Sequence, residues 1–314
     1  MTADLSRFSV NQETVKQLSL PALAAACGTL GITQVGLWRA PVQEYGPAAA
    51  ARLMRDAGLT VTSLCRGGFL TGRDPAGRRR ALDDNRAAVD EAATLGTRTL
   101  VLVSGGLPAG SRDLAGARER IADGLAELAP YAAARGVRLA IEPLHPMFAA
   151  DRCVVSTLAQ ALDLAERFPA EQVGVVVDTY HLWWDDRVPA QLARAAGPTA
   201  APAPPSGEPP GDLRGTGTGT PGRGVARRGS GGGRIAAFQL ADWVTPLPEG
   251  ALLGRGQLGD GSVDLRGFRE LLDAVGYDGP IEVELFNAEL WARDGVEVLA
   301  ETAERYVRHV LGRA

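Results

Sequence analysis

Residues 138–146 read RLAIEPLHP, and residues 173–181 read VGVVVDTYH. In each stretch a short apolar run, typical of a strand buried on both faces, ends directly on an acid: Glu142 in the first and Asp178 in the second. Parallel sheets contain such strands, and their active sites lie at the carboxyl ends of the strands. The two stretches therefore predict an α/β fold with acidic side chains gathered at one edge of its sheet.

Similar apolar runs recur outward from these two and alternate with longer amphipathic stretches that predict helices, two of which close on Gly96 and Gly136. Eight strand-then-helix units predict a (β/α)8 TIM barrel, with residues 1–314 forming a single domain. An open doubly wound sheet is less favoured, because it normally has a glycine-rich turn after its first strand and NQETVK follows here. The predicted strands are Arg7–Asn11, Gln34–Trp38, Val61–Cys65, Thr99–Val103, Arg138–Glu142, Gly174–Asp178, Ile235–Leu240 and Ile281–Leu285.

Residues 197–234 interrupt this pattern between the sixth helix and the seventh strand. Half of them are glycine or proline, and none is aromatic. Such a composition buries too little apolar surface to offset the entropy of ordering the chain. We expect a low-complexity, disordered insertion. Its place before the seventh strand, at the face opposite to barrel active sites, argues against an active-site lid.

The composition excludes several classes of protein. A net charge of −4 offers no basic surface for nucleic acid, and no apolar run is long enough to span a membrane. Cys27, Cys65 and Cys153 are few and far apart, which predicts no disulfide framework and a cytoplasmic protein. The single lysine, Lys16, disfavours Schiff-base chemistry, and three histidines are too few for a multi-zinc site rich in imidazole.

The acids at the strand ends predict a metal site. Glu142, Asp178 and Glu284 each follow an apolar run, and Glu284 shares a strand face with Glu282. Burying such acids unpaired is costly, and a divalent cation compensates their charge. An oxygen-rich set of ligands suits Mn²⁺, Mg²⁺ or Co²⁺ more than structural zinc.

Taken together, five motifs resemble the xylose isomerase-like TIM barrels, also known as sugar phosphate isomerases/epimerases. This family includes ketose 3-epimerases, hydroxypyruvate isomerases, inosose dehydratases and 3-dehydroshikimate dehydratases. The resemblance covers nearly the whole chain outside the insertion. The motifs are IEPLHP (141–146), VDTYH (177–181), FQLADW (238–243), GRGQLGDGSVDL (254–265) and IEVELF (281–286).

The resemblance implies metal ligands at Glu142, Asp178, Gln239 and Glu284, with Glu142 and Glu284 also serving as the catalytic acid and base. The epimerase branch has histidine at the strand-7 position, where this chain has Gln239. Some dehydratase relatives carry glutamine there. Because an amide oxygen is a harder ligand than imidazole, the substitution favours Mg²⁺ or Mn²⁺.

Further residues are expected to bind substrate. His181, three residues after the strand-6 acid, and Arg255 are implied by the resemblance, and an arginine fork suits a carboxylate, a phosphate or vicinal hydroxyls. His145, Trp38 and Arg66 follow predicted strands and are candidates for the same mouth. For each of the five, a purely structural role is the alternative.

Together, these expectations predict that the protein is a divalent-metal-dependent isomerase or epimerase. It would act on a small keto-sugar or related polyhydroxy carbonyl compound through a metal-bound enediolate. The same carboxylates would serve a dehydratase of the inosose or dehydroshikimate type, which is the main alternative. A non-catalytic barrel acting as a partner subunit would be expected to lose its metal acids, and a repair-type phosphodiesterase would need more histidines. The sequence leaves open whether the protein is a homodimer or a homotetramer.

Overall fold

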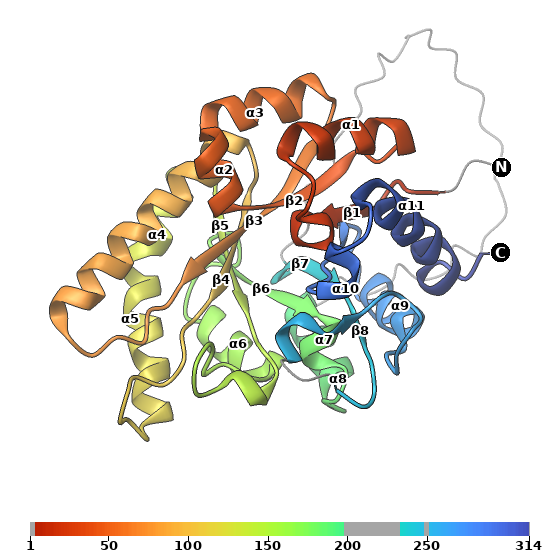
Figure 1. Cartoon of the computed structure of the whole chain (residues 1–314). Coiled ribbons are helices and arrows are strands. Elements are labelled where there is room, and N and C mark those ends of the chain that lie inside the picture. Colours follow the sequence, from red (N-terminus) through yellow and green to blue (C-terminus); the bar gives the residue numbers. More distant parts are fainter. Residues whose placement is uncertain (1–3, 198–232, 248–250, 314) are drawn as a thin grey trace, which may run out of the picture.

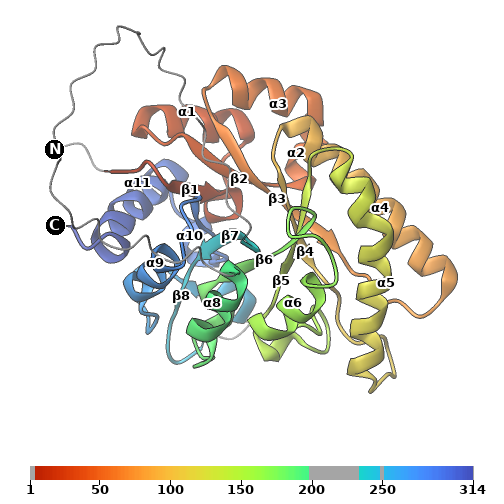
Figure 2. The same ribbon diagram turned by 180° about the vertical axis from the view of Figure 1, so that it is seen from behind.

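Eight parallel strands close into a barrel in the computed structural model, which describes residues 4–197, 233–247 and 251–313. The strand order around the barrel is β1-β10-β7-β6-β5-β4-β3-β2, and helices surround it (Figures 1 and 2). This confirms the predicted TIM barrel. Residues 198–232, most of the predicted insertion, lie outside the described residues.

Four of the eight barrel strands have the bounds predicted from the sequence, and two others, β3 and β10, differ from the prediction in ways that affect the site. Strand β3 runs on to Gly68 because a bulge shifts its register between Cys65 and Gly67. Strand β10 ends at Val283, so Glu284 lies just past it. The barrel strands are β1 (Phe8–Asn11), β2 (Gln34–Trp38), β3 (Thr60–Gly68), β4 (Thr99–Val103), β5 (Arg138–Glu142), β6 (Val173–Asp178), β7 (Ile235–Leu240) and β10 (Ile281–Val283).

The barrel separates two apolar regions by the alternation of side chains along each strand. In β7, Phe238 and Leu240 belong to the large core between strands and helices, whereas Ala237 belongs to a small cluster inside the barrel with Cys65 and Val101. Gln239 shares the inward face with Ala237 and is fully buried.

Helices form the outer layer, with α4 and α5 packed side by side (Figures 1 and 2). Glycines in the left-handed conformation end α1 at Gly31 (φ 70°) and α4 at Gly96 (φ 78°). The helices are α1 (Leu20–Leu30), α2 (Arg39–Tyr45), α3 (Pro47–Asp56), α4 (Pro75–Leu95), α5 (Leu114–Ala133), α6 (Leu158–Ala165), α7 (Thr179–Leu182), α8 (Val188–Ala196), α9 (Leu265–Ala274), α10 (Ala288–Trp291) and α11 (Gly295–Arg305), with short η1 (Gln12–Val15), η2 (Pro146–Phe148), η3 (Ala251–Leu253) and η4 (Tyr306–Val310).

Arg234, just after residues 198–232, lies beside Ala195, just before them. The backbone N–H of Arg234 donates to the carbonyl of Ala195 at 2.6 Å, and the Arg234 guanidinium donates to the carbonyls of Ala165 and Phe168. These contacts lie at the amino-terminal end of β7, away from the acids at the strand ends. Within the described residues, none of the helices has both the length and the apolar character needed to cross a bilayer.

Candidate active site

A cavity of about 110 Å³ opens at the carboxyl ends of the strands. Its lining combines apolar side chains with the carboxyl groups of Glu142 and Glu284 and with three arginines. Because this face holds the active sites of TIM barrels, the cavity is the natural candidate site. It is lined by Trp38, Cys65, Arg66, Val101, Val103, Glu142, Leu144, Arg152, His181, Leu252, Arg255, Glu284 and Phe286.

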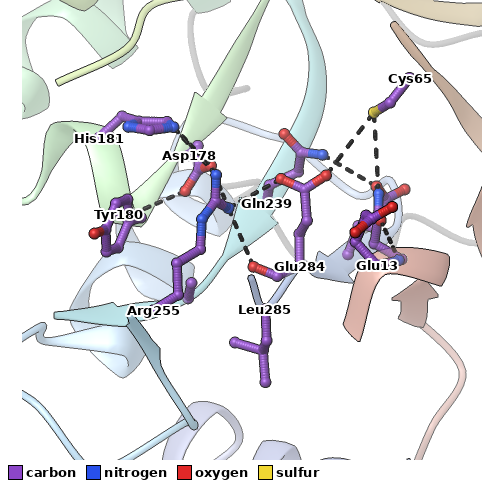
Figure 3. A network of polar contacts seen from close by, with 12 residues as sticks. Glu13, Cys65, Asp178, Tyr180, His181, Gln239, Arg255, Glu284 and Leu285 are labelled. Carbon is purple, nitrogen blue, oxygen red and sulfur yellow. Dashed lines mark hydrogen bonds and ion pairs between the residues drawn. The ribbon is translucent and has the colours of Figure 1, made fainter. Parts of the chain in front are cut away.

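A buried guanidinium joins two of the three predicted metal acids. Nη1 of Arg255 lies 2.9 Å from Oε2 of Glu284 and 3.3 Å from Oδ2 of Asp178, and it also donates to the Glu284 carbonyl at 3.1 Å (Figure 3). The guanidinium packs between the rings of Tyr180 and Phe286. Arg255 therefore lies deeper than an arginine that only meets substrate at the mouth, and it holds Glu284 in place.

The buried carboxylate of Asp242 stabilises the loop that carries Arg255. Two short antiparallel strands, β8 (Asp242–Trp243) and β9 (Arg255–Gly256), pair Trp243 with Arg255. The Asp242 carboxylate accepts four backbone N–H bonds at 2.8–3.0 Å, from residues 243, 259, 261 and 263. Gly261 allows this close approach, because a Cβ there would lie 2.3 Å from the Trp243 carbonyl oxygen. The acid that follows strand 7 is thus a loop anchor and lies buried.

Gln239 points into the barrel and is paired on one side only. Its Nε2 donates to Oε1 of Glu282 at 3.1 Å, while its Oε1 is buried and has no hydrogen-bond partner in the described part of the chain. The Glu282 carboxylate also accepts from Asn11 at 2.8 Å and from the Thr62 and Ser63 hydroxyls. These donors fix Glu282, and Glu282 in turn fixes the Gln239 amide with its oxygen unpaired.

His181 faces the acids as a neutral ring. Burial, followed by the nearby charge of Arg255, lowers the pKa of His181 well below its usual value. Its Nδ1 accepts the backbone N–H of His145 at 3.2 Å, and its Nε2 lies 3.7 Å from Asp178 and 3.9 Å from Glu142. The Nη2 of Arg255, which can only donate, lies 3.3 Å from the same Nε2, so donors face both ring nitrogens. A neutral imidazole has one acceptor nitrogen, so His181 accepts from only one of these two donors at a time.

Negative charge exceeds positive charge among the buried groups. Burial raises the pKa of Glu142 well above its usual range and raises the pKa of Asp178. Burial also raises the pKa of Glu284 to about 8, although Arg255 opposes this change. Three acids thus face one guanidinium and a neutral histidine, and the Glu142 carboxylate has no hydrogen-bond donor in the described residues.

The residues present fit a divalent cation. Ligand atoms of Glu142, Asp178 and His181 lie within 4.8 Å of one another, which is close enough to hold an ion. A cation would compensate the excess negative charge and would give the orphaned Gln239 oxygen a partner. Carboxylate and amide oxygens outnumber the one imidazole in this set of donors, and Mg²⁺ and Mn²⁺ prefer oxygen ligands.

The structure brings most of the predicted site residues together. Six of them line the cavity: Trp38, Arg66, Glu142, His181, Arg255 and Glu284. Asp178 and Gln239 are fully buried and are not among the residues that line it. His145 does not line it either, because its ring packs on Trp243 and Trp184 and only its backbone contacts His181.

Several residues that line the cavity were not predicted from the sequence. Phe286 ends the IEVELF motif and Cys65 ends a predicted strand, so both carried a positional signal. Arg152 carried none, because it lies in the long connection between β5 and α6 and reaches the cavity only through the fold.

A family model described as xylose isomerase-like TIM barrel matches residues 21–302. The chain belongs to this family. Among solved structures, protein SMc04130 from Sinorhizobium meliloti 1021 is 40% identical, with a TM-score of 0.84 over 98% of this chain and 99% of that one.

Two curated relatives of this xylose isomerase-like barrel carry different activities in their names. A 3-dehydroshikimate dehydratase from Pseudomonas aeruginosa is 28% identical over 276 residues, which are 86% of this chain and 36% of that enzyme. An inosose isomerase from Bacillus velezensis is 24% identical over 249 residues, which are 76% of this chain and 72% of that one. The chain therefore spans little more than a third of the dehydratase, and its relatives include both a dehydratase and an isomerase.

Proposed function

We propose that this protein is a divalent-metal-dependent isomerase or epimerase of a small keto-sugar or related polyhydroxy carbonyl compound. The observation that carries the proposal is the buried cluster of Glu142, Asp178 and Glu284, whose charge one arginine only partly compensates, beside the orphaned oxygen of Gln239. Glu142, Asp178, Gln239 and Glu284 would hold the metal. When bound, the metal polarises the substrate carbonyl and makes the neighbouring C–H more acidic.

Two glutamates then have the properties required for moving a proton. Glu142 ends β5 and Glu284 follows β10, and both line the cavity; burial raises the pKa of each, that of Glu284 to about 8. A carboxyl group with such a pKa both takes and returns a proton near neutral pH. One glutamate, ionised, removes the proton beside the carbonyl and keeps it, and the other, protonated, donates its own proton to the enediolate of the substrate. Return to the opposite face gives epimerisation, and return to the neighbouring carbon gives isomerisation.

Dehydration is the second candidate, and two observations favour it. The amide of Gln239 stands where the epimerase branch has histidine. The dehydratase relative also matches 86% of this chain. A glutamate would remove the proton, and a protonated carboxyl group of Glu142 or Glu284 would donate a proton to the departing hydroxyl, which leaves as water. Mass spectrometry of the product separates the two reactions, because only dehydration loses one water.

Chelation and site substitutions test the proposal. Against keto-sugars, inososes and hydroxy-keto acids, we expect turnover to disappear with chelator and to return with Mn²⁺, Mg²⁺ or Co²⁺. Glu142→Gln and Glu284→Gln should each lower kcat by about 10²- to 10⁴-fold while the protein remains folded. The control is Glu44→Gln, which changes an exposed carboxylate on α2. Turnover that is insensitive to chelation, or near-wild-type rates in both site variants, would contradict the proposal.

A further inference from the structure

Two arginines that line the cavity donate no hydrogen bond to a carboxylate in the described part of the chain. Arg66 lines the cavity, and it makes no ion pair or hydrogen bond within the described ranges. Its guanidinium lies 4.3 Å from the centre of the Phe69 ring. Arg152 also lines the cavity, and its nearest carboxylate is the exposed Asp151, at 3.8 Å and beyond hydrogen-bond distance. Each guanidinium therefore keeps most of its hydrogen-bonding capacity.

The fold brings these two side chains to one cavity from distant parts of the chain. The β3 bulge between Cys65 and Gly67 leaves Arg66 as an extra residue in the strand, and bulges commonly re-aim a side chain next to an active site. Arg152 comes from the connection between β5 and α6. Both line the same cavity, and burial, followed by the charge of Arg152, lowers the pKa of Arg66.

The polar groups that line the cavity thus fall into two sets. Glu142 and Glu284 provide carboxyl groups, and the third lining arginine, Arg255, is already engaged by Glu284 and Asp178. Arg66 and Arg152 provide positive charge that these buried acids do not contact through any hydrogen bond or ion pair in the residues described. A ligand that suits both regions has hydroxyl or carbonyl oxygens at one end and an anionic group at the other.

We propose that Arg66 and Arg152 together bind an oxyanion, a carboxylate or a phosphate, carried by the substrate. Guanidinium forks bind both groups through two parallel N–H bonds. The inference rests on the proposed function, since it specifies the substrate of that same site. It restricts the substrate to an anionic keto compound, such as a hydroxy-keto acid or a phosphorylated keto-sugar, and disfavours neutral sugars.

Anion binding to the full-length protein tests the site without requiring turnover. Isothermal titration with malonate and with inorganic phosphate separates the two anions. We expect one of them to bind the wild type, and Arg66→Gln and Arg152→Gln to weaken that binding by about 10- to 100-fold. Arg55→Gln is the matched control, because Arg55 is exposed on α3 and loses the same charge. Binding that is equal in all four proteins, or absent from the wild type, would overturn the proposal.

A kinetic comparison then links the site to the substrate. Matched keto compounds with and without the anionic group should show a higher kcat/KM for the anionic member, and Arg66→Gln should abolish that preference mainly through KM. Wild-type preference for the neutral member would overturn the oxyanion site and leave the proposed function intact. Anion binding that depends on both arginines, with no turnover of any keto compound, would instead contradict the proposed function alone.

Discussion

Replacing Asp242 by asparagine isolates the contribution of one buried carboxylate to the loop that carries Arg255. Oδ2 of Asp242 accepts from the backbone N–H groups of Gly259 and Gly261, and Oδ1 accepts from those of Trp243 and Val263. An asparagine has one acceptor oxygen and one donor NH₂, so either orientation leaves two backbone donors without an acceptor. At about 1–3 kcal/mol for each unsatisfied buried donor, Asp242→Asn should lower the free energy of unfolding by about 2–6 kcal/mol.

Urea unfolding and thermal melting measure this loss directly. The lower bound of about 2 kcal/mol corresponds to a decrease in Tm of roughly 3 °C for a domain of this size. Asp264→Asn is the control, because Asp264 is exposed at the start of α9 and accepts a single N–H, from Gly267 at 2.9 Å. Asparagine caps helices about as well as aspartate, so its Tm should barely change. Equal Tm values for the two variants would refute the assignment of Asp242 as the loop anchor.

Three further predictions concern the metal, the insertion and pH. Gln239→Leu should leave the Tm of the metal-free protein nearly unchanged, because the loss of the hydrogen bond to Glu282 is offset by removal of the orphaned oxygen. The same variant should weaken Mn²⁺ binding at least about tenfold by titration calorimetry, whereas Gln239→His should retain Mn²⁺ binding. Deleting residues 199–232 should change Tm by no more than a few degrees, because halving a loop alters closure entropy by only about 0.6 kcal/mol; a larger loss would show that the segment docks on the barrel. Because burial raises the pKa of Glu284 from 4.5 to about 8, its contribution to the stability of the metal-free protein is complete below pH 4.5 and is lost as the pH rises to about 8. Mn²⁺ should therefore stabilise the wild type more as the pH rises across this window. If Glu284→Gln and the wild type show the same pH dependence of urea unfolding without metal, this reasoning is wrong.

The barrel could be predicted from the sequence because the patterns that indicate its strands and helices are local. Apolar runs buried on both faces and glycines that end helices depend on neighbouring residues only, and β2, β4, β5 and β7 have the bounds expected from them. The strand-end acids were found for the same reason, since a carboxylate directly after a buried strand marks its active end. The β3 bulge at Arg66 could not be predicted, because it arises from pairing with β4.

The roles of individual polar residues depended on contacts between distant segments. Glu282 and Glu284 are equivalent by strand alternation, but Glu282 is held by Asn11, Thr62 and Ser63, whereas Glu284 contacts Arg255. Arg152 joins the cavity through a loop without a recognisable pattern. Such partnerships are set by packing across the barrel and have no signature in the spacing of the residues themselves.

The central claim is that Glu142 and Glu284 move a proton at the carbon beside a carbonyl in a metal-dependent reaction. Incubation with candidate keto compounds in D₂O, followed by mass spectrometry of recovered substrate and product, tests it most directly. We predict deuterium at that carbon with wild-type protein and Mn²⁺, and none above background after chelation or in Glu142→Gln and Glu284→Gln. Turnover without solvent deuterium at that carbon, or unchanged exchange in both variants, would contradict the account.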